Sequence, residues 1–258
     1  MSINNFEWWH PIQGFSEELD IPELAIEDGS NYKVNSYNYR CDEFIKNHKG
    51  KHILFSGCSY TFGIGLFKKE TWAYSVYKKI NESEACSGYF NLGIKGNSIN
   101  NSILNIFKYC KQFGNPDIIF INLPESKRFF AFDEKECKYK ITYHTSNDKM
   151  FKINILVNYN NYLMLEQYCK NNNIKLFSFT YDIHQTNNLK STNDLFKDFN
   201  FKSFYYIDYN KMLKELFLLK KNNDSKFFDF ARDAIPHRGI GWNIWWGNFI
   251  YNKYLESL

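Results

Sequence analysis

The feature that most constrains the fold is a pattern of short apolar runs, each followed by a loop and then by a segment with helical periodicity. The runs cover residues 52–55, 89–92, 116–123 and 174–180. The helical segments cover residues 70–80, 99–113, 151–169, 211–219 and 242–255. The third run is almost wholly apolar, which is typical of a strand covered on both faces. This alternation predicts an α/β fold, a three-layer α/β/α sandwich with a parallel sheet, of the flavodoxin-like type.

The length of the chain fits one large domain. Its 258 residues, of which 44% are hydrophobic and 19% aromatic, can bury a sizeable core but divide poorly into two. Residues 1–50 lack clear periodicity, so we expect an irregular N-terminal arm packed on a main domain of residues 51–258. Residues 129–149 predict an insertion near the carboxyl edge of the sheet. Residues 204–208 fit either a fifth strand or an extended piece before a helix.

Composition narrows the classes of partner and setting. The formal net charge is only +4 at pH 7, which is too small to indicate a nucleic acid as partner. Six cysteines lie far apart without a Cys-x-x-Cys pair, which favours reduced thiols over disulfides or a zinc site. The first residues show no signal peptide and no run reaches the length of a membrane span, so we expect a cytoplasmic protein without a membrane partner.

A glycine-marked loop, residues 57–65, follows the first expected strand. Ser59 lies between two tight bends that can expose its hydroxyl beside backbone N–H groups able to face a developing oxyanion. Because open parallel sheets bind ligands at the carboxyl ends of their strands, Ser59 is the first candidate nucleophile. Ser59 and Thr61 also fit a turn and a helix cap. Cys58 is either a rival nucleophile or a packing residue. The loop lacks the Gly-Lys-Ser/Thr ending of a phosphate-binding loop.

Three loops that should leave the same sheet edge carry small or hydroxyl residues. These are Ser59, Gly96 and Ser126. His237 is a further candidate, because Asp233 lies nearby and a proline and a glycine fix its loop. The other histidines have no such neighbours, and a lone histidine is usually a surface or hydrogen-bonded core residue. The tryptophans of the closing helix favour core packing over an acceptor site, because their spacing is helical.

With these loops in place, the sequence resembles the SGNH (GDSL) hydrolase family of serine esterases, and in particular the divergent members encoded by tailed phages. The first family block, Gly-Asp-Ser-x-x-x-Gly, is similar to residues 57–63, with Cys58 in the place of Asp. The second block, Asn-x-Gly-x-x-Gly, matches residues 91–96. Ser126 stands where the third block has Asn, and the last block, Asp-x-x-His, has one additional residue here. The resemblance covers about residues 35–255.

The resemblance implies a hydrolase that needs no metal or other cofactor. Ser59 would attack an ester carbonyl after His237 takes its proton, and Asp233 would orient the imidazole. Asp229 is a remoter candidate for the acid. The implied substrates are small-molecule or carbohydrate esters, O-acetyl esters among them, and the oligomeric state is left open.

The resemblance also implies an oxyanion hole. The N–H groups of Ser59 and Gly96 would bind the oxyanion, with Ser126 as a third donor. A serine hydroxyl is shorter than the family's Asn amide, so Asn97 and Arg128 are candidates to compensate.

Two other functions fit the same sequence. One is a catalytically inactive SGNH-like fold that serves as a binding or structural module, such as a component of a virion. This reading is motivated by Cys58, Ser126 and the long spacing from Asp233 to His237. The other is a flavodoxin-like domain that binds a nucleotide or FMN.

Overall fold

The structure, a computed structural model, describes residues 32–133, 138–143, 149–183, 191–223, 225, 228–231 and 237–258. The strands are β1 (Ile53–Gly57), β2 (Phe90–Asn91), β3 (Ile118–Leu123), β4 (Arg128–Asp133), β5 (Lys138–Tyr143) and β6 (Lys175–Thr180). The helices are α1 (Ser59–Phe62), α2 (Trp72–Ser83), α3 (Ile99–Phe113), α4 (Lys149–Asn171), α5 (Thr192–Phe199), α6 (Tyr209–Lys221) and α7 (Ile240–Leu255), with a short 3-10 turn η2 (Lys68–Glu70).

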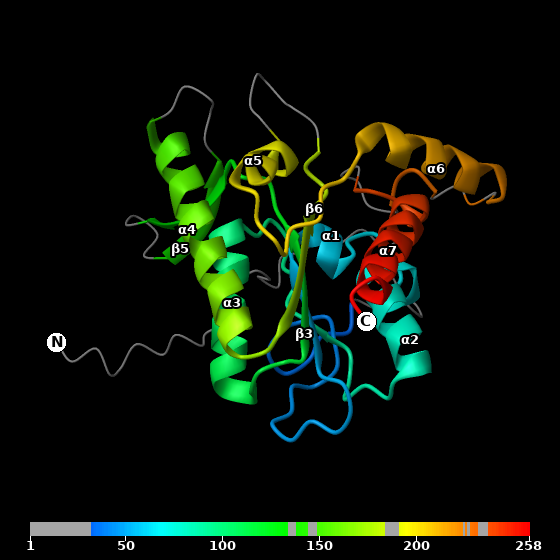
Figure 1. The fold of residues 1–258 in the computed structure, drawn as a ribbon, viewed down its shortest axis with the longest axis horizontal. Helices are drawn as coiled ribbons and strands as arrows, with labels where there is room; N and C mark the ends of the chain where they lie inside the picture. Colours follow the sequence, from blue (N-terminus) through cyan, green and yellow to red (C-terminus); the bar gives the residue numbers. More distant parts are fainter. Residues whose placement is uncertain are drawn as a thin grey trace.

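Four parallel strands in the order β2-β1-β3-β6 form the central sheet. Figure 1 shows α3 and α4 on one face of this sheet and α2 and α7 on the other. The three-layer α/β/α sandwich predicted from the sequence is therefore confirmed. From β1 the chain crosses to β2 at one edge, and from β3 it crosses to β6 at the other. In such a sheet the crevice for a ligand lies at the carboxyl ends of the two strands where the order reverses, here β1 and β3.

The alternation of side chains along the strands divides the core into two apolar clusters. Leu54 and Ile119 belong to the cluster under α3 and α4. Phe55, Phe120 and Phe177 belong to the cluster under α2 and α7, and their rings stack across the sheet with centroids 5.4 Å and 5.0 Å apart. Both faces of the central strands are therefore buried, which explains why β3 reads as a continuous apolar run.

Side-chain caps fix where several helices begin. Thr71 accepts a hydrogen bond from the backbone of α2, and Ser98 accepts one from the backbone of α3. Ser191 and Asp208 do the same for α5 and α6. Each cap satisfies an N–H group that has no partner within its own helix.

The structure differs from the sequence-based prediction in three segments. The insertion expected at 129–149 contains the antiparallel pair β4–β5. Helix α5 has only eight residues and was not predicted, because two turns are too few to show a helical period. Residues 204–208 form no strand, and Phe204 makes a single bridge to Ser178 of β6, so the extended alternative is correct.

The described part of the expected arm, residues 32–50, lies against the main domain. Tyr39 and Phe44 are buried in the cluster under α3. The Arg40 guanidinium donates to the carbonyl oxygens of Phe62, Gly63 and Leu66 at 3.2, 2.9 and 3.0 Å. Residues 1–31 lie outside the described residues, so the arm as a whole stays a prediction. No helix in the described part of the chain is long and apolar enough to cross a membrane.

Candidate active site

The sharp turn at Ser59 depends on Gly57. Its φ is +151°, and a Cβ there would lie 2.3 Å from Thr61 Oγ1 and 2.6 Å from the carbonyl oxygen of Asn122. The chain can therefore pass directly from β1 into α1, whose first residue is Ser59. Ser59 is not the cap of this helix. Cys58 occupies the cap position without a side-chain cap bond and is fully buried in the cluster under α2 and α7, which favours packing over nucleophilic attack.

The second loop is fastened to the first. The Asn91 amide donates to the carbonyl oxygen of Thr61 at 2.8 Å. A Cβ on Gly93 would lie 2.5 Å from the backbone nitrogen of Phe62, so only glycine allows this approach. The Asn97 amide donates to the carbonyl oxygen of Gly57 at 3.1 Å. The first two family-like blocks therefore form one rigid unit at the rim of the sheet.

Two backbone N–H groups of this unit are open. Within the described residues, the N–H groups of Ser59 and Gly96 donate to no acceptor. Gly96 has φ +71°, and apart from its chain neighbours no atom of the described residues lies within 4 Å of where its Cβ would be, so it borders open space. Asn97 is not such a donor, because its amide bonds both Gly57 and the Ser102 hydroxyl, the latter at 2.9 Å. Open N–H donors of this kind suit an oxyanion.

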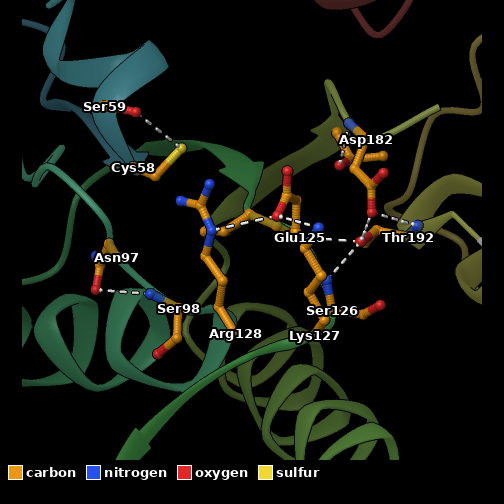
Figure 2. A network of polar contacts seen from close by, with 12 residues as sticks. Cys58, Ser59, Asn97, Ser98, Glu125, Ser126, Lys127, Arg128, Asp182 and Thr192 are labelled. Atoms are coloured by element: carbon orange, nitrogen blue, oxygen red, sulfur yellow. Dashed lines mark hydrogen bonds and ion pairs between the residues drawn. The ribbon is translucent and has the colours of Figure 1, made fainter. Parts of the chain in front are cut away.

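The third loop is held by a polar network (Figure 2). The N–H of Ser126 donates to Thr192 Oγ1 at 2.8 Å, and the Thr192 hydroxyl donates to Asp182 Oδ2 at 2.7 Å. The carbonyl oxygen of Ser126 accepts from the amides of Asn154 and Asn158 at 2.6 and 3.3 Å. Burial raises the pKa of Asp182, against the lowering effect of its hydrogen bonds from Thr192. The buried Asp182 carboxylate therefore holds the Ser126 loop through Thr192.

Ser126 and Arg128 point in different directions. In Figure 2 the Ser126 hydroxyl points away from the Ser59 turn, whereas the Arg128 guanidinium points toward it. Arg128 is 9% exposed, and its Nε lies 3.5 Å from Glu125 Oε2. Lys127 Nζ lies 3.2 Å from the same carboxylate oxygen. The loop thus presents a buried guanidinium beside the turn, and the Glu125 carboxylate lies close to both Arg128 and Lys127.

His237 comes close to the Ser59 turn through Tyr60. The rings of Tyr60 and His237 have centroids 5.5 Å apart. The His237 segment is held by an antiparallel bridge between Phe230 and Arg238, and the His237 carbonyl oxygen accepts from the N–H of Ala231 at 2.9 Å. Segments that are far apart in the sequence therefore meet beside the Ser59 turn. The assignments of Ser59 as nucleophile and His237 as base remain predictions.

The two acid candidates differ in what the structure describes. Asp233 lies outside the described residues. The carboxylate of Asp229 forms an ion pair with Lys220 of α6, and its carbonyl oxygen accepts from the N–H of Gly239 at 3.0 Å. Asp229 therefore has a structural contact of its own, and Asp233 stays the predicted acid.

Two tyrosines that sequence reasoning missed border the site. Tyr60 and Tyr181 stack with centroids 4.0 Å apart. Burial raises the pKa of Tyr60 to about 12 and also raises that of Tyr181, so both phenols are neutral donors at neutral pH. Their sequence positions carry a usable signal, since Tyr60 follows Ser59 and Tyr181 follows β6 directly.

The closing helix behaves largely as predicted. Trp245 and Trp246 are buried in the core. Trp242 is only partly buried, and the guanidinium of Arg238 stacks on its ring 4.0 Å from the centroid. In the described part of the chain, no three His, Cys, Asp or Glu side chains are grouped as metal ligands.

No protein-family model matches the chain, and no curated protein matches it. Similar solved structures include the psychrotrophic esterase EstA from Pseudoalteromonas sp., with 14% identity and a TM-score of 0.46 over 79% of this chain and 98% of that one. They also include the acetyl xylan esterase Est2A from the rumen bacterium Butyrivibrio proteoclasticus, with 12% identity and a TM-score of 0.48 over 80% of this chain and 64% of that one. The acetyl xylan esterase AlAXEase has 15% identity and a TM-score of 0.44 over 80% and 98%.

Proposed function

We propose that this chain is an ester hydrolase of the SGNH type that acts through a covalent acyl-enzyme on Ser59. The observation that carries the proposal is the ring contact between Tyr60 and His237 at 5.5 Å. It joins the residue after the proposed nucleophile to the proposed base, although 177 positions separate them. A serine hydroxyl needs such a base to become a nucleophile at neutral pH.

In the proposed mechanism, His237 takes the proton of Ser59 as its oxygen attacks the ester carbonyl. The open N–H groups of Ser59 and Gly96 bind the oxygen that becomes negative. His237 then returns the proton to the leaving alcohol, and water releases the acid from Ser59 by the same route in reverse. Asp233 is proposed to orient the imidazole. The direction of the Arg128 guanidinium in Figure 2 supports it as a third donor in place of Ser126.

The experiment is the replacement of Ser59 by alanine, with p-nitrophenyl acetate as substrate. We expect kcat/KM to fall by at least about a thousandfold, because removal of a nucleophile leaves only the binding contribution. A fluorophosphonate probe should label the wild-type protein at Ser59 and leave S59A unlabelled.

The matched control is Cys58→Ala, which alters the neighbouring residue. It should keep the activity and the labelling, since Cys58 is buried and contributes packing. Full activity in S59A would contradict the proposed hydrolysis through Ser59. If the wild type shows no activity and no labelling, that result favours the alternative, a non-catalytic binding or structural module. That alternative draws support from the low exposure of Ser59, 3%.

A further inference from the structure

The helix that begins with Ser59 is too short to hold its own shape. Helix α1 has four residues, a single turn, and one turn fixes several backbone dihedrals in exchange for very few hydrogen bonds. The proposed reaction nevertheless needs the Ser59 hydroxyl and N–H in fixed positions, because a displacement of about 1 Å can cost about a hundredfold in rate. Gly57 and the second loop fasten the beginning of this turn, so its end needs a contact of its own.

Arg40 supplies that contact from the segment before the sheet. Its side chain is buried, and Nη1 donates to the carbonyl oxygens of Phe62 and Gly63 while Nη2 donates to that of Leu66. Phe62 is the last residue of α1, and Gly63 is its C-cap in the left-handed conformation. The last carbonyl groups of a helix have no partner inside it, and a cation is favourable beside them. One side chain therefore satisfies the end of α1.

The contact of Arg40 reaches Ser59 through a single residue. The carbonyl oxygen of Gly63 accepts from Arg40, and the N–H of Gly63 donates to the carbonyl oxygen of Ser59 at 2.8 Å. Gly63 has little room to move, because a Cβ there would overlap Thr71 Cγ2 and lie 3.2 Å from Arg40 Nη1. A change at Arg40 is therefore passed to the backbone of Ser59.

Tyr32 fixes the plane of the Arg40 guanidinium. The guanidinium carbon lies 4.3 Å from the centroid of the Tyr32 ring and 5.6 Å from that of Phe62. The Tyr32 hydroxyl accepts from the N–H of Gly65 at 2.6 Å, so Tyr32 contacts the same loop. A guanidinium that lies on an aromatic ring presents its N–H groups in fixed directions, which the flexible ammonium of a lysine does not reproduce.

We propose that Arg40 is a positioning residue for the proposed nucleophile: it acts on Ser59 through the backbone of Gly63 and makes no contact with substrate. The inference rests on the proposed function and extends its machinery to residues 32–40, which precede the first strand. A positioning role predicts a specific kinetic result. Loss of Arg40 should lower the reactivity of Ser59 and leave the affinity for substrate almost unchanged.

The test is Arg40→Met, which keeps the apolar stem and removes the donors. With p-nitrophenyl acetate, kcat should fall at least about tenfold while KM stays within about twofold, and fluorophosphonate labelling should slow in parallel. Arg40→Lys keeps the buried charge and should restore only part of kcat. Tyr162→Phe is the matched control, because it removes a buried hydrogen bond to Ser203 at 2.7 Å beneath α4. It should lower stability and leave kcat unchanged.

Hydrogen–deuterium exchange gives a measurement that needs no reaction. In R40M, peptides covering residues 59–66 should exchange faster, whereas those of α3 should not change. Wild-type kcat in folded R40M, a loss of kcat no larger than in Y162F, or unchanged exchange at residues 59–66 would overturn the proposal. Full esterase activity of S59A, together with faster exchange in R40M, would instead contradict the proposed function and leave the hold of Arg40 on the turn intact.

Discussion

Arg128 combines low exposure with a full charge at the edge where the proposed reaction takes place. It points toward the Ser59 turn in Figure 2, two positions beyond Ser126, which the resemblance to SGNH hydrolases aligns with an asparagine. A guanidinium donates charge-assisted hydrogen bonds, which are stronger than those of a neutral amide. The missing asparagine is therefore compatible with stabilisation of an oxyanion, provided that the donor comes from Arg128.

Replacing Arg128 by glutamine should lower kcat for p-nitrophenyl acetate by about 10²–10³-fold and change KM little, as expected for a donor that acts mainly in the transition state. Lys127→Gln is the matched control, because Lys127 contacts the same Glu125 carboxylate and is only half-buried. A similar loss of kcat in both variants would mean that catalysis depends on the positive charge of the loop and not on hydrogen bonds from Arg128.

His52 sits in an environment that disfavours its protonation. Its ring stacks on His48 with centroids 3.4 Å apart, and its Nε2 lies 2.8 Å from the Tyr109 hydroxyl. Burial, and then the neighbouring His48, lower the pKa of His52 from 6.5 to about 3. The folded protein therefore keeps this ring neutral over a range of pH in which the unfolded chain binds a proton.

This difference predicts a loss of stability in acid. As the pH falls below about 6.5, only the unfolded state gains the proton, so the free energy of unfolding falls by up to about 1.4 kcal/mol per pH unit until the pH nears 3. Urea unfolding at pH 7 and pH 4.5 should show a smaller decrease for His52→Gln than for the wild type. Tyr109→Phe, which leaves His52 buried, should keep the wild-type decrease. Parallel pH profiles for H52Q and wild type would contradict the lowered pKa.

Asn243 joins the starts of two helices. Its Oδ1 accepts from the N–H of Trp72, the first residue of α2, at 3.0 Å. Its amide donates to the carbonyl oxygens of Gly239 and Arg238 at 2.9 and 3.3 Å. One buried side chain in α7 therefore positions both the beginning of α2 and the segment that carries His237.

Asn243→Ala should remove all three bonds and leave buried groups unsatisfied, which costs about 1–3 kcal/mol for each such group. We expect a lower melting temperature by differential scanning calorimetry and a lower kcat, because the His237 segment loses its anchor. Asn248→Ala, on the same helix but half-buried, loses one contact to Lys79 and should change both little. Unchanged kcat in a destabilised N243A would show that the segment is held by other contacts.

Elements with a long apolar period could be predicted from the sequence, and those defined by tertiary contact could not. Helix α3 has the predicted bounds because its apolar residues repeat over 15 positions. The bridge from Phe204 to Ser178 has no local signal, since it depends on β6 lying alongside. The same holds for the site. The glycine-marked loop allowed the sequence to place Ser59 at the turn after β1, and its role as nucleophile stays a prediction. The hold of Thr192 and Asp182 on the Ser126 backbone had no local signal, because these residues come from distant parts of the chain.

Stability of the molecule as a whole depends on rings that cross the sheet. Phe120 lies in a central strand, is fully buried and stacks between Phe55 and Phe177. Tyr254 of α7 covers this row, with ring centroids 6.4 Å from Phe120 and 6.2 Å from Phe177. Its hydroxyl donates to Glu84 Oε1, beyond the end of α2, at 2.7 Å. Through Tyr254, α7 therefore contacts both the phenylalanine row of the sheet and the residue that follows α2.

Phe120→Ala should lower the free energy of unfolding by about 3–5 kcal/mol, the usual cost of a large cavity in a rigid core. Urea titration followed by circular dichroism measures this change. Phe217→Ala removes the same atoms from a side chain that is 61% exposed and should change stability by less than about 0.5 kcal/mol. Equal effects of the two substitutions would mean that the Phe120 site collapses and leaves no cavity.

The place of α7 in the chain order has a consequence during synthesis. All four strands of the sheet leave the ribosome before α7 does, since β6 ends at Thr180 and α7 begins at Ile240. Until then α2 is the main cover over the row of phenylalanines, and a nascent chain with bare aromatic surface is prone to aggregate. Aggregation of the nascent chain should therefore fall once α7 has docked on this surface.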